Sequence, residues 1–302
     1  MYVNNSNLVS NQYKLEEAMN ISNEQSLSEQ IENMLVERNL RGMKDLQSQL
    51  TSGYCLRAAK ILKNIKGNIL IGTGFPVVNT FETDGPVGAL ILYHALEILG
   101  ARPVLVCGTV MANAFQHDYR TCAISIGKKD IALAEAKSAI SHFKPQAIIS
   151  IECPGIAENG CYHNMRGEDI SSQAACFDFF MDEASCPTIA IGDGGNEIGM
   201  GNVKDVLAQF DIIPAVTKCD ELIISDVSNW GVYGILAFLS LWSQHDLLNE
   251  TCPETMLKYI SKLGSVDGVT RKNELTEDGL PASEGIALIS RISALIGYPS
   301  AN

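Results

Sequence analysis

The sequence predicts a layered α/β/α fold: a single domain with a mostly parallel or mixed central sheet and extra helices at its ends. Short apolar or β-branched runs alternate with stretches of helical length, which is typical of parallel strands joined by helical crossovers. The body of the 302-residue chain contains no internal repeat and no low-complexity linker. Its hydrophobic content of 46% is ample for one buried core.

The first 25 residues are rich in Asn, Ser and Gln without apolar periodicity, so we expect a mobile arm over residues 1–25 and a folded domain over 26–302. Helical spacing of apolar residues predicts helices over Ser28–Leu50 and Leu56–Ile65 before the first strand. Strands are predicted at Asn68–Ile71, Pro103–Cys107, Thr121–Ile126, Ala147–Ile151, Thr188–Ile191 and Leu222–Ser225. Further helices are predicted at Val87–Leu99, Ile131–His142, Ile170–Met181, Tyr233–Gln244, Pro253–Leu263 and Ser283–Leu295.

Charge and composition exclude several classes of function. The net charge of -13, without a Lys/Arg block, disfavours binding to nucleic acid or anionic membranes. No stretch approaches the roughly 20 apolar residues that cross a bilayer, and the start of the chain lacks a signal-peptide pattern. Nine cysteines without a close CxxC pair favour reduced thiols, mostly in the core. We therefore expect a cytoplasmic protein with neither nucleic acid nor membrane as partner.

The loop after the first predicted strand carries two neighbouring acids, Glu82 and Asp84. Ligands of open α/β sheets bind beyond the carboxyl ends of the strands, so this loop is a candidate site. Pro86 fits the first turn of the next helix, and Asp84 alone could be a helix cap. In an extended segment, however, Glu82 and Asp84 point to the same side. Two adjacent carboxylates repel unless a cation or a shared proton compensates, so both are candidate ligands.

The loop after the fourth predicted strand begins with an acid, Glu152, and continues to a polar cluster that includes Tyr162, Asn164 and Arg166. These side chains form a plausible cradle for a polar substrate. The planar guanidinium of Arg166 suits a substrate carboxylate, which it can bind through two hydrogen bonds. The alternative is a solvated surface loop in which Asp169 caps the next helix.

The strongest local signal is the loop Gly192–Gly201, where five of ten residues are glycine. The GxGxxG pattern fails at Glu197 and the P-loop pattern fails at Met200. Asp193, Asn196 and Glu197 offer hard oxygen ligands, which favour Mg²⁺ or Mn²⁺ over zinc. The alternative is a tight turn that carries solvated acids.

The last predicted strand ends at Asp226 and leads to Asn229 and Trp230. This places an acid and an amide at the expected crevice, and Asn229 is a candidate substrate contact. Trp230 either packs over the substrate or belongs to the core, and we favour the core.

Taken together, these motifs resemble the D-glutamate cyclase family from about Leu50 to Leu295. They stand in the family's order: Thr73-Gly74-Phe75, Glu82-Thr83-Asp84-Gly85-Pro86, Glu152 with Pro154-Gly155, Tyr162-His163-Asn164-Met165-Arg166-Gly167, the Gly192–Gly201 loop, Val227-Ser228-Asn229-Trp230-Gly231 and Asp267-Gly268-Val269. The chain departs from the family at Glu277, where we expect Val, and this puts any role for Asp278 in doubt.

The resemblance implies a hydro-lyase that closes free D-glutamate to 5-oxo-D-proline with loss of water. It also implies a divalent metal, Mg²⁺ or Mn²⁺, no organic cofactor and a small acidic amino acid as the partner. Residues 26–302 would then be a D-glutamate cyclase-like catalytic domain. Our own assignment of metal ligands is Asp84, Glu82, Asp193, Asn196 and Glu197. The expected catalytic residues are Glu82, Glu197 and Asp193, and the expected substrate contacts are Asn164, Arg166, Tyr162 and Asn229.

Two other functions fit the same residues. Clustered acids with Mg²⁺ or Mn²⁺ also serve phosphoryl transfer, so a metal-dependent phosphohydrolase is the first alternative. It predicts release of phosphate from simple esters and no effect on D-glutamate. The second is a catalytically silent small-molecule-binding protein, which predicts thermal stabilisation by a ligand without product.

Overall fold

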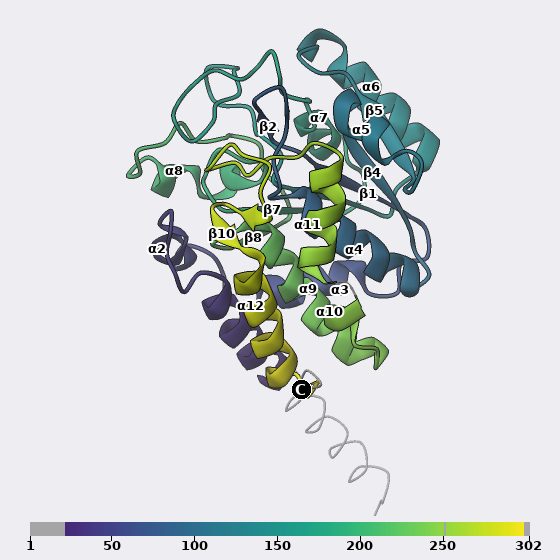
Figure 1. The fold of residues 1–302 in the computed structure, drawn as a ribbon, viewed down its shortest axis with the longest axis vertical. Helices are drawn as coiled ribbons and strands as arrows, with labels where there is room; N and C mark the ends of the chain where they lie inside the picture. Colours follow the sequence, from purple (N-terminus) through teal and green to yellow (C-terminus); the bar gives the residue numbers. More distant parts are fainter. Residues whose placement is uncertain (1–21, 251, 299–302) are drawn as a thin grey trace, which may run out of the picture.

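The computed structural model describes residues 22–250 and 252–298 (Figure 1). Most of the predicted arm lies outside these residues, while residues 22–25 already belong to a helix over 22–35. Within the described part of the chain, no helix is both long and apolar enough to cross a membrane.

Six strands form one sheet in the order β5-β4-β1-β6-β7-β8, and every neighbouring pair is parallel. The strands are β1 Asn68–Thr73, β4 Arg102–Gly108, β5 Thr121–Ile124, β6 Ala147–Ile151, β7 Thr188–Gly192 and β8 Glu221–Ile224. The chain adds strands to one side of β1 and then returns to the other side with β6. The layered α/β fold predicted from the sequence is thus confirmed, with a sheet that is parallel throughout. Its switch point lies between β1 and β6, where such folds bind ligands.

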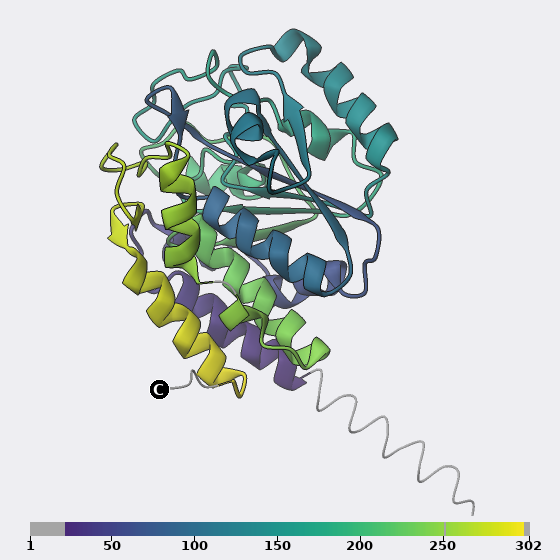
Figure 2. The same cartoon turned by 45° about the vertical axis from the view of Figure 1, so that its right-hand side comes forward.

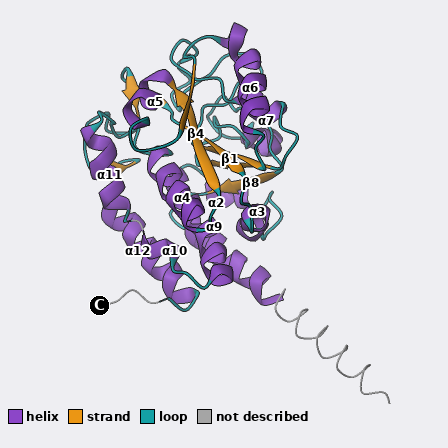
Figure 3. Cartoon of the chain, turned by 90° about the vertical axis from the view of Figure 1, so that its right-hand side faces the viewer, coloured by secondary structure: helices purple, strands orange, loops and turns teal. Residues whose placement is uncertain are grey.

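Helices cover both faces of the sheet (Figure 3). One face carries α3 Tyr54–Leu62, α4 Pro86–Ile98 and α9 Ser228–Ser243, and the other carries α5 Thr109–Phe115, α6 Lys129–Phe143 and α7 Asp178–Asp182. The helix over 22–35 and the helices after α9 lie outside α4 and α9 (Figure 2). These later helices are α10 Leu247–Glu250, α11 Pro253–Lys262 and α12 Ala282–Leu295. Because both faces are covered, β6 and β7 are buried at every position.

Outside the main sheet, the loops contain short strands and short helices. Two antiparallel pairs are β2 Pro76–Val77 with β3 Thr80–Phe81, and β9 Thr276–Glu277 with β10 Leu280–Pro281. The short helices are α2 Met43–Gln47, η1 Met200–Val203 and α8 Lys204–Leu207. Each of the nine cysteines is a free thiol, and Cys55, Cys107, Cys153 and Cys176 are buried as small core residues.

Two predicted helices differ from the structure. The helix predicted at Ile170–Met181 is wrong over most of its length, and only its end belongs to α7. The backbone here pairs with the loop after β5 instead: Ala175 bridges to Ile126, and the Ala174 carbonyl accepts the N–H of Gly127 at 2.9 Å. The helix predicted at Ser28–Leu50 breaks after residue 35 and resumes at α2.

Candidate functional site

A cavity of about 470 Å³ opens at the carboxyl edge of the sheet, next to the switch point. Its walls come from the loops after β1, β6 and β7, from the segment between the first helix and α2, and from the β9–β10 hairpin. Its lining includes five acids and three arginines. These are Glu82, Glu152, Glu168, Asp193, Asp278, Arg41, Arg166 and Arg271.

Three buried carboxylates meet beside this cavity. One carboxylate oxygen each from Asp84, Glu152 and Asp193 lies within 4.8 Å of the others. The three side chains follow β1, β6 and β7, which are adjacent in the sheet. Buried like charges repel unless a cation or protons compensate. Asp193 Oδ2 has no hydrogen-bond partner among the described residues, and the all-oxygen donor set fits Mg²⁺ or Mn²⁺.

Asp84 is held by a helix other than the one that follows it. Its Oδ1 and Oδ2 accept the backbone N–H groups of Asn229 and Ser228, each at 2.8 Å, at the start of α9. Burial, followed by the charge of Asp278, raises the pKa of Asp84 to about 7. The interpretation of Asp84 as a helix cap therefore holds in part, but for α9 rather than α4, and it does not remove Asp84 from the acid cluster.

Glu152 belongs to the cluster although it is missing from the expected ligands. Its backbone φ is +49°, a left-handed conformation that non-glycine residues adopt at a cost and that often marks a functional site. Ser228 Oγ donates to Glu152 Oε2 at 2.5 Å. Burial, followed by the charges of Glu197 and Asp84, raises its pKa well above the usual range. Its position directly after the buried strand β6 is the sequence feature that could have identified it as a ligand.

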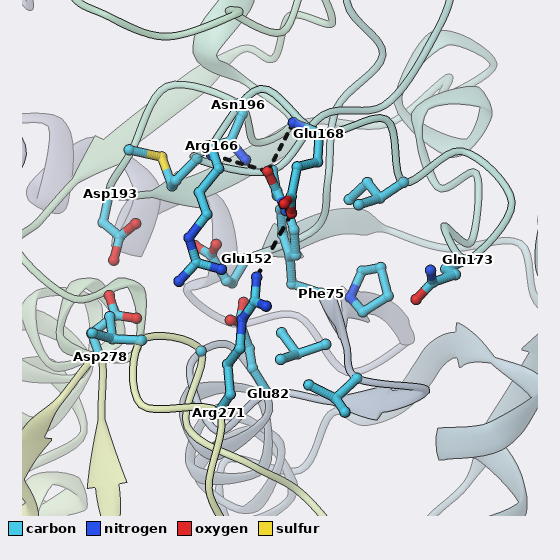
Figure 4. A pocket seen from close by; sticks show the side chains of 18 of the residues that line it. Phe75, Glu82, Glu152, Arg166, Glu168, Gln173, Asp193, Asn196, Arg271 and Asp278 are labelled. Carbon is cyan, nitrogen blue, oxygen red and sulfur yellow. Dashed lines mark hydrogen bonds and ion pairs between the residues drawn. The ribbon is translucent and has the colours of Figure 1, made fainter.

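Asp193 belongs to the acid cluster and also pairs with an arginine. Arg41 Nη1 lies 2.7 Å from Asp193 Oδ1 and 2.6 Å from Asp278 Oδ2. Figure 4 shows Asp193 and Asp278 facing each other on one side of the cavity. Burial raises the pKa of Asp193 well above its usual range, and Arg41 opposes this rise. Arg41, which no sequence motif indicates, thus lines the cavity, as does Asp278, whose role the sequence left in doubt.

Two further acids fix the segments that carry Arg41 and Asp278. The carboxylate of Asp226, after β8, accepts the backbone N–H groups of Arg38 at 2.8 Å and Leu40 at 3.3 Å. These bonds tie the segment before Arg41 to the sheet. Asp267 accepts the N–H of Gly279 at 2.7 Å, beside Asp278 in the β9–β10 turn. Asp226 and Asp267 therefore position the site without lining its cavity.

Glu82 lines the cavity as expected and is buried. Burial, followed by the charges of Asp278 and Asp84, raises its pKa well above the usual range. A Cβ atom on Gly268 would lie 2.1 Å from Glu82 Oε2, so any other residue there would displace this carboxylate from its position. This close approach explains the glycine of the Asp267-Gly268-Val269 motif.

Of the two neighbouring ligands expected in the glycine loop, one faces the cavity and the other does not. Asn196 lines the cavity; its Nδ2 donates to the His163 carbonyl at 2.9 Å, and its buried Oδ1 has no partner among the described residues. Glu197 is buried inside the loop and is not among the described residues that line the cavity. Its Oε2 accepts the N–H of Gly195 at 2.7 Å, where φ is +107° and favours glycine.

Two of the four expected substrate contacts line the cavity: Asn164 and Arg166. Asn164 Oδ1 accepts the N–H groups of Arg166 at 2.9 Å and Glu168 at 3.1 Å, which shapes the loop. In Figure 4, Arg166 and Arg271 reach the middle of the cavity from opposite sides. Arg271 Nη2 lies 3.7 Å from Glu168 Oε2. The cavity therefore offers two guanidinium groups to an anionic ligand.

The other two expected contacts, Tyr162 and Asn229, are not among the described residues that line the cavity. The Tyr162 hydroxyl donates to Asp178 Oδ2 at 2.6 Å, inside a separate apolar cluster. Asn229 Oδ1 accepts the N–H groups of Gly85 and Gly88 at 2.9 and 2.6 Å. The structure thus uses both side chains to hold loops and helix starts in place.

We expect Tyr162→Phe to lower the free energy of unfolding by about 1–3 kcal/mol, because it leaves the buried Asp178 without this donor. If Tyr162 has only this structural role, any catalytic activity of the folded variant should stay near that of the wild type. Chemical denaturation and steady-state kinetics measure the two effects. Tyr259→Phe is the matched control, since its hydroxyl donates to the exposed Asp118. Loss of turnover with unchanged stability would instead assign Tyr162 to the substrate.

Glu277 predicts a pH dependence of stability. This buried carboxylate accepts from Asn229 Nδ2 at 3.1 Å and Trp230 Nε1 at 3.3 Å. Burial, followed by the charge of Asp84, raises its pKa from 4.5 to about 8. The folded state therefore holds this proton where the unfolded chain has lost it, and stability should fall as pH rises from about 4.5 through about 8.

Melting temperatures across this range measure the effect. In Glu277→Gln, which cannot ionise, the melting temperature should start lower but fall less with pH, whereas Glu29→Gln at an exposed position should follow the wild type. If the melting temperatures of Glu277→Gln and wild type fell equally with pH, Glu277 would not be the group that holds this proton.

Comparison with known proteins shows which family the chain resembles. A family model described as "D-glutamate cyclase-like, C-terminal" matches residues 31–293. A human protein, "D-glutamate cyclase, mitochondrial", is 29% identical over 225 residues, which cover 66% of this chain and 36% of that protein. The chain thus matches about a third of the length of its curated relative.

Solved structures resemble the chain only distantly. An exopolyphosphatase-related protein from Bacteroides fragilis superposes with a TM-score of 0.40 at 9% identity, covering 83% of this chain and 62% of its own. RecJ from Thermus thermophilus, solved with Mn²⁺, superposes with a TM-score of 0.36 at 12% identity. The match covers 88% of this chain and 42% of the RecJ chain. Scores this low carry no conclusion about function.

Proposed function

Because the chain belongs to the D-glutamate cyclase-like family, we propose that it is a hydro-lyase that closes D-glutamate to 5-oxo-D-proline with loss of water. The observation that supports this most is the meeting of three buried carboxylates beside a cavity that also holds arginines. The carboxylates suit a divalent cation, and the arginines suit an anionic substrate.

Asp84, Glu152 and Asp193 would hold the Mg²⁺ or Mn²⁺ ion, with the unpartnered Oδ1 of Asn196 nearby on the cavity wall. When bound, such an ion supplies Lewis acidity to the γ-carboxylate, which is otherwise a poor electrophile. Glu152 replaces Glu197 in the ligand set that we proposed from sequence. Glu197 instead stabilises the glycine loop through Gly195.

Arg166 binds the α-carboxylate of the substrate and holds the chain of D-glutamate in a folded, near-cyclic conformation. Correct orientation matters because effective molarities of well-oriented intramolecular reactions reach about 10⁵ M or more. The arm of the substrate that carries the γ-carboxyl group then points toward the buried acids. Arg271 lies across the cavity and adds a second positive charge at its centre.

Glu82 transfers the protons. The α-ammonium group must lose a proton before its nitrogen can attack, and the departing γ-oxygen must gain protons to leave as water. A carboxylate whose pKa lies well above its usual range accepts a proton near neutral pH and returns it, as general acid–base catalysis requires. Glu82 is both buried and on the cavity wall, which makes it our choice over Glu197.

The proposed function is tested by incubating the purified protein with D- or L-glutamate, with and without Mg²⁺ or Mn²⁺, and detecting 5-oxoproline on a chiral column. We expect 5-oxo-D-proline from D-glutamate in the presence of metal, and little product from L-glutamate or after chelation. No product from D-glutamate under any metal condition would refute the proposal. Release of phosphate from simple esters would then favour a metal-dependent phosphohydrolase.

We expect Arg166→Gln to raise the KM for D-glutamate by about 10- to 100-fold, because a charge-assisted hydrogen bond contributes about 1.5–3 kcal/mol. The change in kcat should be smaller, since the α-carboxylate is bound equally in the ground and transition states. Arg102→Gln, at an exposed position where β4 begins, is the control. An unchanged KM would remove Arg166 from the substrate site.

A further inference from the structure

A second cavity of about 210 Å³ adjoins the first. Four residues line both cavities: Phe75, Pro76, Asn79 and Gln173. None of the described residues that line the second cavity is ionisable, and its other walls are mainly apolar, with Phe81, Val110, Met111 and Ile126 among them. The charged cavity therefore borders an uncharged, largely apolar one.

The two cavities follow one another along the carboxyl edge of the sheet. The buried acids follow β1, β6 and β7, whereas Gly108 and Ile126 place the second cavity beyond β4 and β5. The β2–β3 hairpin borders both cavities, because its residues contribute to both linings. In Figure 4, the shared residue Gln173 lies on the opposite side of the first cavity from Asp193.

D-glutamate makes no use of the second cavity. It carries charges at both ends, and its only apolar atoms are the short chain between them, while a charge is costly to bury in uncharged surroundings. The first cavity alone, at about 470 Å³, lies within the range of about 300–1,000 Å³ that holds drug-sized ligands. The pair of cavities thus fits a substrate with a charged D-glutamyl part and an apolar extension.

We propose that the chain also cyclises γ-D-glutamyl amides of apolar amines, with the apolar group of the amine in the second cavity. This inference rests on the proposed function, since it uses the same attack on the same carbon. The α-amine nitrogen forms a bond to the γ-carbonyl carbon, and the amide C–N bond breaks. The proton lost by the α-amine passes to the departing nitrogen. The products are 5-oxo-D-proline and the free amine, and no water, oxidant or reductant is needed.

The γ-linkage follows from the placement of the charged groups. The α-carboxylate is the group that Arg166 and Arg271 can bind in the first cavity, so an amide there would forfeit that contact. The γ-carbonyl lies at the acids after β1, β6 and β7, and the neighbouring strand β4 leads directly to the apolar cavity. An uncharged γ-amide also avoids placing another carboxylate among buried acids, which would add repulsion.

The test compares the purified metal-loaded protein on four compounds: D-glutamate, γ-D-glutamyl methylamide, γ-D-glutamyl benzylamide and α-D-glutamyl benzylamide. Release of 5-oxo-D-proline and of the amine is followed by chromatography. We expect kcat/KM for the γ-benzylamide to exceed that for the γ-methylamide by at least about tenfold, because burial of the ring stabilises the complex. The α-benzylamide should release neither product, because attack on its free γ-carboxyl group would lose water and leave the benzylamine bound in 5-oxo-D-prolyl benzylamide.

Val110→Trp tests where the apolar group lies. Val110 is 50% exposed on α5 and lines only the second cavity, so a larger side chain there narrows it. We expect the ratio of γ-benzylamide to γ-methylamide turnover to fall at least about tenfold. The control is Ile98→Trp, 46% exposed at the end of α4 and outside both cavities, which should leave this ratio unchanged.

The outcomes separate this inference from the proposed function. Turnover of D-glutamate without turnover of any γ-amide overturns the inference and leaves the proposed function standing. Equal rates for γ-benzylamide and γ-methylamide, or a ratio that Val110→Trp does not change, overturn the role of the second cavity. Turnover of γ-amides without turnover of D-glutamate supports the inference and replaces D-glutamate as the substrate. Failure of all four compounds refutes both.

Discussion

Asp193→Asn is expected to lower the rate of 5-oxo-D-proline formation by at least about 10²- to 10³-fold, the loss typical when one strong electrostatic contact with a transition state is removed. Asp193 lies close to Asp84 and Glu152, and its buried Oδ2 has no hydrogen-bond partner among the described residues. Asparagine keeps the shape of the side chain but removes its charge and one of its two oxygens. The variant should therefore lose affinity for Mn²⁺ while it remains folded.

The fold should survive because the substitution also removes repulsion between buried carboxylates. Circular dichroism and thermal melting check the fold, and Mn²⁺ titration checks the binding of the ion. Asp130→Asn, at an exposed position in the first turn of α6, is the matched control and should behave as the wild type. Near-normal turnover by Asp193→Asn would remove Asp193 from the site.

The second large effect is expected for stability. Arg41→Met should lower the free energy of unfolding of the metal-free protein by about 3 kcal/mol or more, because loss of one partner from a buried ion pair typically costs about 3–5 kcal/mol. Arg41 contacts both Asp193 and Asp278, and its side chain is 20% exposed, so the lower end of this range applies.

The sign of the pH dependence follows from the carboxylate that loses its partner. Without Arg41, the pKa of Asp193 rises further, and the carboxyl group accepts a proton at low pH instead of remaining charged and unpaired. Arg41→Met should therefore be closer to wild type at pH 5 than at pH 8. Saturating Mn²⁺ should restore part of the stability at pH 8, because a bound cation replaces the lost charge.

Urea denaturation at both pH values, with chelator or with Mn²⁺, measures these differences. The control is Arg102→Met at an exposed position, for which we expect a change below about 0.5 kcal/mol. Wild-type stability of metal-free Arg41→Met at pH 8 would show that Arg41 does not balance the acids.

The six strands of the central sheet could be predicted to within two residues at each end, because buried parallel strands are continuous apolar runs. The same reason located the site: Asp84 and Asp193 follow strands β1 and β7, so the sheet brings them together. The short hairpin strands β2, β3, β9 and β10 were not predicted. The region predicted as a helix at Ile170–Met181 shows the limit of periodicity. Its backbone partners lie in the loop after β5, and no local pattern encodes that pairing.

The remainder of the site depends on contacts between segments distant in sequence. Arg41 precedes the first strand and meets Asp193 about half the chain away, so no local motif marks it. Asp278 was discounted because its neighbour Glu277 departs from the family, yet the departure concerns a residue bound to Trp230 rather than the cavity wall. Tyr162 has the polar hydroxyl of a substrate contact, but its partner is Asp178.

The most direct test of a shared metal site is a crystal structure of the protein grown with Mn²⁺, with the anomalous signal of manganese recorded. We expect one strong anomalous peak in contact with carboxylate oxygens of Asp84, Glu152 and Asp193, and its loss in Asp193→Asn. Absence of a peak among these three side chains at saturating Mn²⁺, in crystals that still convert D-glutamate, would contradict the account.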